Sequence, residues 1–238
     1  NNACGLATGG TPLENWKNAL EADPVSAFGG IIVTTSEVDE TLAGEIGKLF
    51  FEVLIAPSYT SGALKILTEK KNRILLKLKK IVLQDQQYRT ILNGVLWQER
   101  DVKTEIVPDV NAVTPVRPTS TQLADLISAN TIAKHSRSNT IVLVKNSRLI
   151  AAGVGQTSRV DALEQAIEKA KRFGLSIEGA VMASDAFFPF PDCVEIAHKA
   201  GIAAVIQPGG SKKDQESIDY CNENGIAMVL SVTRHFRH

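Results

Sequence analysis

The chain has 238 residues, enough for one large domain or two small ones, and 44% of them are hydrophobic, which suits a globular protein with a real core. Lysine plus arginine and aspartate plus glutamate both number 26, and this zero net charge argues against a whole-chain electrostatic grip on nucleic acid or an anionic membrane. No stretch approaches the roughly 18 apolar residues of a membrane span.

Three cysteines, Cys4, Cys193 and Cys221, are odd in number and far apart, which suits neither a disulfide framework nor a Cys-x-x-Cys metal pair. We therefore expect reduced thiols in a cytoplasmic protein. The chain starts at Asn1 without methionine, and we expect this to be an interior start with an N-terminal part missing.

The first hundred residues alternate predicted strands and helices, an order that favours a buried sheet with helices on its faces. Thr11, Pro12 and Glu14 are typical of a helix start, and this helix is predicted to run to residue 22. Gly29 and Gly30 precede a strand and either make a tight turn or let a ligand come close. Further helices are predicted at 36–51 and 58–70, and strands at 31–35, 53–56 and 73–78.

The stretch from 79 to 120 is the least regular part of the sequence. Residues 79–83 are predicted to extend the preceding strand, and residues 94–101 are predicted to form another. Three prolines and no clear period follow, so we interpret 101–120 as a linker. It would join a first lobe, 1–100, to a second lobe, 121–238.

The second lobe is predicted to alternate in the same way, starting with a helix after Thr119 or Ser120 and a hairpin that joins 140–145 to 149–153. A faint internal repeat relates 53–78 to 181–206, so we expect two lobes of one ancestral α/β unit. The ligand pocket is expected in the cleft between the lobes or between subunits. The remaining helices are predicted at 158–172, 192–200 and 213–223, and the strands at 180–183, 203–206 and 227–230.

Several positions suit a ligand, each with a plainer alternative. Residues 153–156 and 207–212 are glycine-rich strand ends before helices, where backbone N–H groups either bind an anion or simply turn the chain. Arg159 lies in the first turn of a helix, where the macrodipole disfavours a cation, which suggests a ligand role rather than a solvated arginine. Asp192 opens a helix, either as its N-cap or as an acceptor for a ligand.

Two aromatic stretches and one histidine need an interpretation as well. Three phenylalanines in 184–192 must pack on a flat ligand or on the subunit core. The tail 234–238 is basic around Phe236 and is either part of a site or a frayed terminus. Lys134 and His135 end a helix, where cations are favoured, so we give them a structural role. A zinc deaminase would need a His-x-Glu and a Pro-Cys-x-x-Cys, and the sequence has neither, so we expect no metal catalysis.

Seven stretches, in chain order, together resemble one family: 23–30, 52–57, 138–139, 155–160, 184–192, 207–211 and 234–238. They resemble the transformylase part of the bifunctional purine-biosynthesis family that joins AICAR formyltransferase to IMP cyclohydrolase, AICAR being 5-aminoimidazole-4-carboxamide ribonucleotide. The resemblance covers the chain from Asn1 to His238 and ends at the family's C-terminus. It implies an α/β fold of two tandem cytidine-deaminase-like α/β/α lobes without zinc.

The resemblance also implies an activity, the transfer of a formyl group from the co-substrate 10-formyltetrahydrofolate to the 5-amino group of AICAR. An aromatic ring can stack on a flat imidazole, and guanidinium groups can bind carboxamide or phosphate oxygens. Asn139 would polarise the formyl oxygen, where charge develops in the transition state. The nucleotide would be surrounded by Gly29, Glu52, Asn139, Arg159, Phe187 and Arg234, and the folate would face Val160, Asp192, Ser211 and Lys212.

One departure limits what this chain can do. The family's general-base histidine and its lysine fall just upstream of Asn1 and are absent here, as is the cyclohydrolase domain. We therefore predict that residues 1–238 alone are inactive or nearly so. The resemblance implies a homodimer with sites across its interface, acting on small molecules and not on nucleic acid or membrane. Two alternative functions stay open: a non-catalytic nucleotide- or folate-binding module, and a deaminase-like zinc enzyme. The presence of a monovalent cation near the site also stays open.

Overall fold

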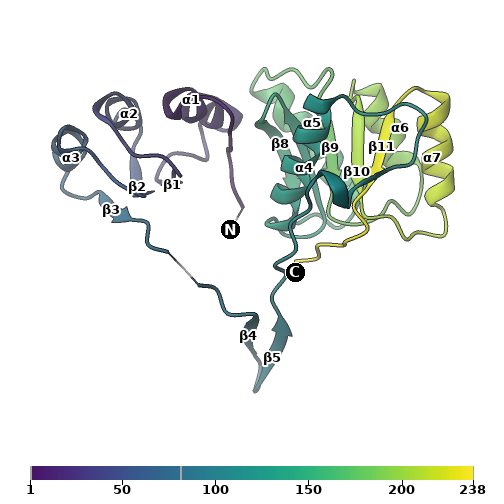
Figure 1. Cartoon of the computed structure of the whole chain (residues 1–238), viewed down its shortest axis with the longest axis horizontal. Coiled ribbons are helices and arrows are strands. Elements are labelled where there is room, and N and C mark those ends of the chain that lie inside the picture. Colours follow the sequence, from purple (N-terminus) through teal and green to yellow (C-terminus); the bar gives the residue numbers. More distant parts are fainter. Residues whose placement is uncertain (1, 81, 238) are drawn as a thin grey trace.

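The computed structural model describes residues 2–80 and 82–237. It has two α/β lobes side by side and a β-hairpin that projects away from both (Figure 1). We call elements α1 to β3 the first lobe and elements α4 to β11, with the short strand β6, the second lobe. Asn1, Ile81 and His238 belong to stretches interpreted above but lie outside the described residues.

The first lobe is a parallel sheet of three strands in the order β1-β2-β3. Helix α1 begins as predicted, because the Thr11 side chain accepts from Glu14 N and the Glu14 carboxylate accepts from Thr11 N. The apolar core of this lobe lies between α2, α3 and one face of the sheet. The elements are α1 (Pro12–Ala22), β1 (Gly30–Val33), α2 (Glu40–Ile46), β2 (Phe51–Ala56), α3 (Ser61–Thr68) and β3 (Ile74–Lys77).

The helix predicted at 36–51 is shorter than expected at both ends. Val38 makes a bridge with Tyr59, and the Asp39 carboxylate then caps the helix by accepting from Leu42 N at 2.8 Å. At the other end Phe51 already belongs to β2. Residues 36–51 therefore contain a bridge, a helix and the start of a strand. Their apolar residues continue at helical spacing through all three, so periodicity alone could not separate them.

The projecting hairpin consists of β4 (Gln86–Ile91) and β5 (Gly94–Glu99). Only the second of these strands was predicted, because the first is largely polar. The predicted extension of the preceding strand through 79–83 was wrong, since β3 ends at Lys77 and the described residues 79, 80, 82 and 83 belong to no strand. In the hairpin Tyr88 lies opposite Trp97, and both side chains are exposed.

The stretch predicted as a linker contributes to the second lobe. After a short 3-10 turn, η1 (Val107–Asp109), strand β6 (Asn111–Ala112) pairs antiparallel with β11 at the edge of the larger sheet. The domain boundaries at residues 100 and 120 stay predictions.

The second lobe is a six-stranded sheet in the order β6-β11-β10-β9-β7-β8, with helices on both faces (Figure 1). Strands β9, β10 and β11 are parallel, and β7 is antiparallel to both of its neighbours. Helix α4 packs on one face, and α5 and α6 contribute to the core on the other. The elements are α4 (Ser120–Lys134), β7 (Thr140–Lys145), β8 (Arg148–Val154), α5 (Arg159–Arg172), β9 (Val181–Ser184), α6 (Asp192–Lys199), β10 (Ala204–Gln207), α7 (Asp214–Glu223) and β11 (Ala227–Leu230).

This three-layered lobe confirms the predicted α/β fold class. Within 2–80 and 82–237, none of the helices is long and apolar enough to cross a membrane. The same residues hold no group of three or more His, Cys, Asp or Glu side chains placed to bind a metal ion.

Candidate functional site

The strand directions bring the predicted residues of the second lobe to one side of its sheet, where β9, β10 and β11 end. By this edge we mean that row of strand ends and not the outermost strand. The chain leaves β9, β10 and β11 at this edge, because the three strands are parallel. Strand β7 is antiparallel to β9, so Asn139 at its start lies at the same edge. Strand β8 ends there too and leads into Arg159 at the start of α5. Ligands of open α/β sheets commonly bind at such an edge.

Arg159 and Asp185 form a pair at the centre of this edge. Arg159 Nη2 lies 3.6 Å from Asp185 Oδ1, and the two side chains are 13% and 0% exposed. Burial lowers the pKa of Arg159 below its ordinary value, whereas the neighbouring Asp185 acts in the opposite direction. The plainer alternative for Arg159, a solvated side chain, is therefore wrong.

This pair is not fully hydrogen-bonded. Arg159 Nε and Nη2 and both carboxylate oxygens of Asp185 are buried without a hydrogen-bond partner. Buried polar atoms are nearly always paired, and each exception calls for an explanation such as an absent ligand, water or ion. The forked donors of Arg159 are thus available to a bound oxyanion or carbonyl group.

Phe236 in the C-terminal tail faces two guanidinium groups. The Cζ atom of Arg234 lies 4.5 Å from the centre of its ring, and that of Arg159 lies 5.8 Å from the same centre. The nearby charge of Arg234 also helps to lower the pKa of Arg159, after burial. Two arginines beside one carboxylate leave a net positive site, which favours a ligand with anionic or carbonyl oxygens.

Asn139 is held by the strand end that precedes α5. Its Nδ2 donates to Gln156 O at 3.1 Å and to Thr157 O at 3.0 Å. An amide nitrogen has two hydrogens, so both are engaged and Oδ1 is left as an acceptor. Donation to a formyl oxygen therefore requires Asn139 to release one of these two carbonyls.

Several N–H groups of the two glycine-rich strand ends are already engaged within the protein. Gly155 N donates to Arg137 O, and Gln156 N donates to Asn139 O. In the other loop, the Asp214 carboxylate accepts from Gly210 N at 2.6 Å and from Ser211 N at 3.1 Å. These contacts favour the plainer alternative, a turn, at the four residues that make them, and anion binding at either segment stays a prediction.

The run 184–192 divides its three phenylalanines among three environments. Phe188 is fully buried in the core, Phe187 is half-buried, and Phe190 is half-exposed with Lys213 Nζ 4.6 Å from its ring centre. Asp192 is the first residue of α6 rather than its N-cap, which is Pro191, and its Oδ1 accepts from Cys193 N at 2.8 Å. Only Phe187 and Phe190 are therefore placed to meet a ligand.

Other predicted residues lie around the same edge with fewer contacts. Ser211 Oγ accepts from Lys213 N at 3.1 Å, and Lys212 is exposed. Val160 follows Arg159 in the first turn of α5 and packs against the core beneath it. These positions agree with a ligand that extends along the outside of the strand ends.

The first lobe does not bring its predicted residues to this edge. Gly29 donates to Phe50 O at the start of β1 with φ 70°, and Glu52 is exposed on β2. No hydrogen bond or ion pair between described residues joins Gly29 or Glu52 to Arg159, Asp185 or Arg234. Strands β1 and β2 lie in the first lobe and helix α5 lies in the second, so the two groups of predicted residues belong to different lobes (Figure 1).

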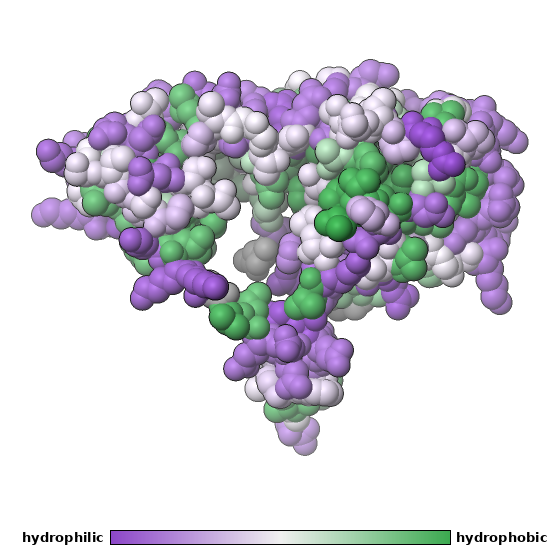
Figure 2. Space-filling view, viewed as in Figure 1, coloured by the Kyte–Doolittle hydropathy of each residue, from purple (hydrophilic) through white to green (hydrophobic). Residues whose placement is uncertain are grey.

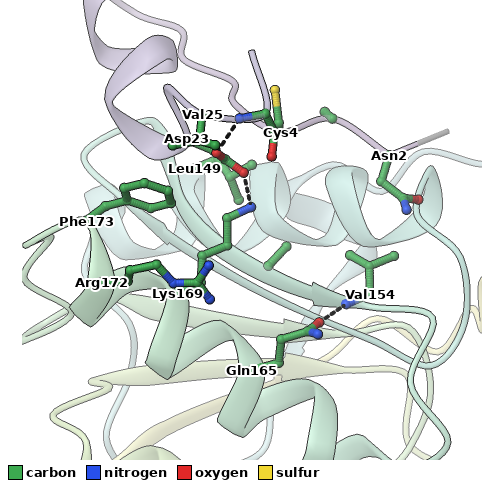
Figure 3. A pocket seen from close by; sticks show the side chains of 13 residues that line it. Asn2, Cys4, Asp23, Val25, Leu149, Val154, Gln165, Lys169, Arg172 and Phe173 are labelled. Atoms are coloured by element: carbon green, nitrogen blue, oxygen red, sulfur yellow. Dashed lines mark hydrogen bonds and ion pairs between the residues drawn. The ribbon is translucent and has the colours of Figure 1, made fainter. Parts of the chain in front are cut away.

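A pocket does lie between the lobes, but it is lined by different residues (Figure 3). It has a volume of about 540 Å³ and lies between the N-terminal segment and the face formed by β8 and α5. Lys169 Nζ reaches across to Asp23 Oδ2 at 2.7 Å, while Asp23 Oδ1 accepts from Ser26 N. None of the predicted nucleotide- or folate-binding residues lines it, so the placement of the ligand site between the lobes or between subunits stays a prediction.

The tail that carries Arg234 and Phe236 is fixed from beneath by His235. Its side chain is 1% exposed and lies between Asp101 and Glu105, and its backbone N–H donates to Asp185 O. The tail is therefore an ordered part of the lobe and not a frayed terminus. Lys134 is buried and contacts Asp101 and Thr104, in agreement with its predicted structural role.

Asp185, His235 and Phe236 were not among the predicted site residues. A signal for Asp185 was present, because an aspartate two residues after the predicted strand 180–183 lies near a strand end. His235 had no such signal, since its partners Asp101 and Glu105 are more than a hundred residues away in the sequence.

Comparisons with known proteins agree on one family. Residues 1–169 match the family model described as "AICARFT/IMPCHase bienzyme". The whole chain is 60% identical to the bifunctional purine biosynthesis protein PurH of Bacteroides thetaiotaomicron and 50% identical to that of Acetivibrio thermocellus. It covers 47% and 46% of these proteins, so the chain spans about half the length of the curated relatives it matches.

Solved structures with partial similarity include two deaminases. One is the dCMP deaminase of cyanophage S-TIM5, with a TM-score of 0.35 and 20% identity over 47% of this chain and 98% of the phage protein. The other is a diaminohydroxyphosphoribosylaminopyrimidine deaminase/reductase of Thermotoga maritima, with a TM-score of 0.34 and 22% identity over 46% of this chain and 36% of that protein.

Proposed function

The chain belongs to the AICARFT/IMPCHase bienzyme family of purine biosynthesis, and we propose that it is the part that carries the transformylase site. The reaction would move a formyl group from 10-formyltetrahydrofolate to the 5-amino group of AICAR. The observation that carries the proposal is the buried Arg159–Asp185 pair beside Arg234 and Phe236, with donors and acceptors left unpaired.

The nucleotide would bind at the arginine pair. The unpaired Nε and Nη2 of Arg159 suit a carboxamide or phosphate oxygen, and Arg234 adds a second forked donor from the exposed side. Phe187 follows Asp185 by two residues in the same loop, and its side chain is half-buried. Its ring would stack on the imidazole. Asn139 would bind through Oδ1 in the ground state and would donate to the formyl oxygen only after releasing Gln156 or Thr157.

The folate would lie further along the strand ends. Asp192 is half-buried in the first turn of α6, where its carboxylate can accept from the N–H edge of a pterin. Val160 would supply an apolar contact, and Ser211 and Lys212 would lie at the outer end. Phe190, half-exposed against Lys213, extends this surface and was not predicted.

The chain's own residues would provide binding and orientation, and in the part that the structure describes neither His135 nor Lys134 is placed as a general base. His135 ends α4, and burial lowers its pKa, which keeps it neutral, but its carbonyl and not its ring contacts the tail at Arg237. Lys134 is tied to Asp101 and Thr104 in the interior. We therefore propose that proton transfer depends on the family's Lys-His pair upstream of residue 1, and that residues 1–238 bind but barely turn over.

A homodimer would explain the separation of the two residue groups. Gly29 and Glu52 lie in the first lobe, away from Arg159 and Arg234. A second chain could present its first lobe to this chain's second lobe and so complete each site. This would place the active site across a subunit interface, as the resemblance implies.

A monovalent cation would fit at Asp185. Hard cations bind oxygen ligands, and both carboxylate oxygens of this buried residue are free of hydrogen bonds. A cation there would neutralise Asp185 and leave Arg159 fully available to the nucleotide. Thermal unfolding in potassium, sodium and tetramethylammonium salts tests this, since only a bound small cation raises the unfolding temperature.

The cytoplasmic location expected from the three free cysteines stays a prediction.

Calorimetric titration of the chain with AICAR and with a folate analogue tests the function. Arg234→Ala is expected to weaken AICAR binding about tenfold or more, because a hydrogen bond to a charged group contributes about 1.5–3 kcal/mol. Asp192→Ala should weaken folate binding and leave AICAR binding unchanged. Lys199→Ala, an exposed lysine at the far end of α6, is the matched control.

Three other outcomes would point elsewhere. Closure of formyl-AICAR to IMP without folate would assign the chain to the cyclohydrolase activity. Binding of both ligands with no turnover even in the full-length protein would leave a non-catalytic binding module. Stoichiometric zinc in the purified protein would revive the deaminase-like enzyme.

A further inference from the structure

One face of the first lobe's sheet is apolar and uncovered. Its side chains form two rows across the three strands, set by the parallel register of β1, β2 and β3. In these rows Ile31 is 68% exposed, Val33 60%, Ile74 53% and Leu76 46%. We call this surface the open face, and its rows are Ile31–Val53–Ile74 and Val33–Ile55–Leu76.

A parallel sheet with one bare face is unusual, because parallel strands are normally buried on both sides. Helices α1, α2 and α3 all lie above this sheet, and hydrophobic side chains appear along its lower side (Figures 1 and 2). Four large aliphatic side chains in adjoining rows exceed the scattered apolar exposure of an ordinary surface. The open face therefore has a missing cover.

The second lobe shows what that cover is. Strands β9, β10 and β11 have the same order and direction as β1, β2 and β3 and are likewise linked by helices. Their corresponding rows are fully buried beneath Leu126, Ala129, Ile132 and Ala133 of α4. These rows are Val181–Ala204–Ala227 and Ala183–Ile206–Val229.

The N-terminal segment confirms this alignment of the two lobes. In the second lobe β8 leads into α5 through Gly153, where a Cβ would lie 1.8 Å from Ala162 O. In the first lobe residues 4–8 lead into α1 through Gly5, where a Cβ would lie 1.9 Å from Ala19 O. Residues 4–8 thus correspond to the end of β8. The repeat is offset by one strand and helix from the predicted one, because β2 matches β10 and not β9.

Strand β1 also has a free edge where β9 has a neighbour. Strand β9 pairs with β7 on this side, whereas β1 pairs only with β2. Thr34 N donates to Ile55 O, so the alternating N–H groups of Ile31 and Val33 point toward the free edge. The first lobe therefore lacks the counterparts of α4 and β7 and the beginning of β8.

We propose that the segment preceding residue 1 in the full-length protein folds onto the first lobe as a helix followed by two strands. The helix covers the open face as α4 covers the second lobe, and the first strand pairs antiparallel with β1. The relatives are about twice as long as this chain, which leaves ample sequence for such a segment. The inference rests on the symmetry of the lobes and does not depend on the transformylase assignment.

Thiol labelling tests the cover directly. Leu76→Cys places a reporter on the open face, and Leu64→Cys, on the helix α3 that covers the opposite face, is the control. Both variants also carry Cys4→Ser, which removes the partly exposed native thiol. The other two cysteines stay unreactive, because burial raises the pKa of Cys193 and Cys221 to about 12. In the full-length protein L76C should react about tenfold or more slowly than in residues 1–238, and L64C should react alike in both.

Hydrogen exchange of the unmodified proteins gives a second readout that needs no substitution on the open face. The amides of Ile31 and Val33 should exchange quickly in residues 1–238 and slowly in the full-length protein. Equal labelling and equal exchange in both proteins would overturn the proposal. So would protection of L76C in residues 1–238 that rises with protein concentration as a dimer forms, because the cover would then be a second copy.

Discussion

The ring of His235 lies 3.0 Å from the carboxylate of Glu105 in the interior of the second lobe, measured from Nε2 to Oε2. The other ring nitrogen, Nδ1, lies 2.5 Å from Asp101 Oδ2. The buried ring therefore lies between two carboxylates of the linker, residues 101–120. Asn130 Nδ2 also donates to Glu105 Oε2. This cluster of side chains therefore connects the linker, helix α4 and the C-terminal tail.

Replacement of His235 should release the tail. His235→Ala removes one of the two hydrogen-bond partners of the buried Glu105 Oε2, and we expect the free energy of unfolding to fall by about 3–5 kcal/mol. The peptide bond after Arg234 should then become sensitive to trypsin under native conditions. Urea unfolding and limited proteolysis measure the two effects. His198→Ala is the control, because His198 is half-buried and bonds only to the Tyr220 hydroxyl; equal trypsin sensitivity of both variants would contradict the anchoring role.

Arg159 and Asp185 should be energetically coupled. Arg159→Met leaves a buried carboxylate, and Asp185→Asn leaves a buried guanidinium, so each single change is expected to destabilise the protein by about 3 kcal/mol or more. The double variant should lose less than the sum, by about 1–3 kcal/mol. Urea unfolding of the four proteins gives the coupling, and additive losses would show that the two groups do not interact.

The Asp23–Lys169 contact between the lobes should make stability depend on acid pH. Burial alone would raise the pKa of Asp23, but hydrogen bonds from Lys169 and Ser26 outweigh it and hold the pKa below the ordinary 3.8. A depressed pKa gives stability that is fully present above the unfolded pKa and is lost as the pH falls through the folded one. Asp23→Asn should therefore unfold more easily than the wild type at pH 6, and the difference should shrink below about pH 4. Unfolding midpoints from pH 2.5 to 7 test this, and a difference that grows toward acid would be the wrong sign.

Gly153 should tolerate no side chain. A Cβ there would lie 1.8 Å from Ala162 O, so α5 must move away from β8. We expect Gly153→Ala to lower the free energy of unfolding by about 2–3 kcal/mol. Gly44→Ala is the matched control, because nothing lies within 4 Å of its added Cβ and the position is helical. That variant should be neutral or stabilised by up to about 1 kcal/mol.

Most elements of both lobes could be predicted from the sequence, since their apolar period and caps were strong. Thr11 was recognised as a cap from a local pattern, and the structure confirms it. Of the two candidate caps Thr119 and Ser120, the structure selects Thr119. Strand β4 was missed because its residues are largely polar and show no alternating apolar pattern. The helix at Glu40–Ile46 was overextended because apolar spacing continued into the bridge at Val38 and the strand at Phe51.

The site was predictable only in part, and the difference lies in sequence distance. Arg159 stood out because a cation in the first turn of a helix conflicts with its surroundings. Asp185 and Phe236 gain their role from tertiary contacts with Arg159, which no local pattern contains. Gly210 and Ser211 suggested an anion site, but Asp214, three residues beyond the loop, accepts their hydrogens instead.

The pairing of the N-terminal segment with β8 has a consequence for motion. Thr8 N donates to Ser147 O and Leu149 N donates to Leu6 O, so main-chain hydrogen bonds join the two lobes. The ion pair between Arg148 and Glu21 adds a contact at 2.6 Å on the same side. Lobes connected through their backbones cannot close over a ligand by hinge rotation without breaking a ladder. Rigid-body rotation of one lobe against the other about this segment is therefore restrained by main-chain hydrogen bonds and not only by side-chain contacts.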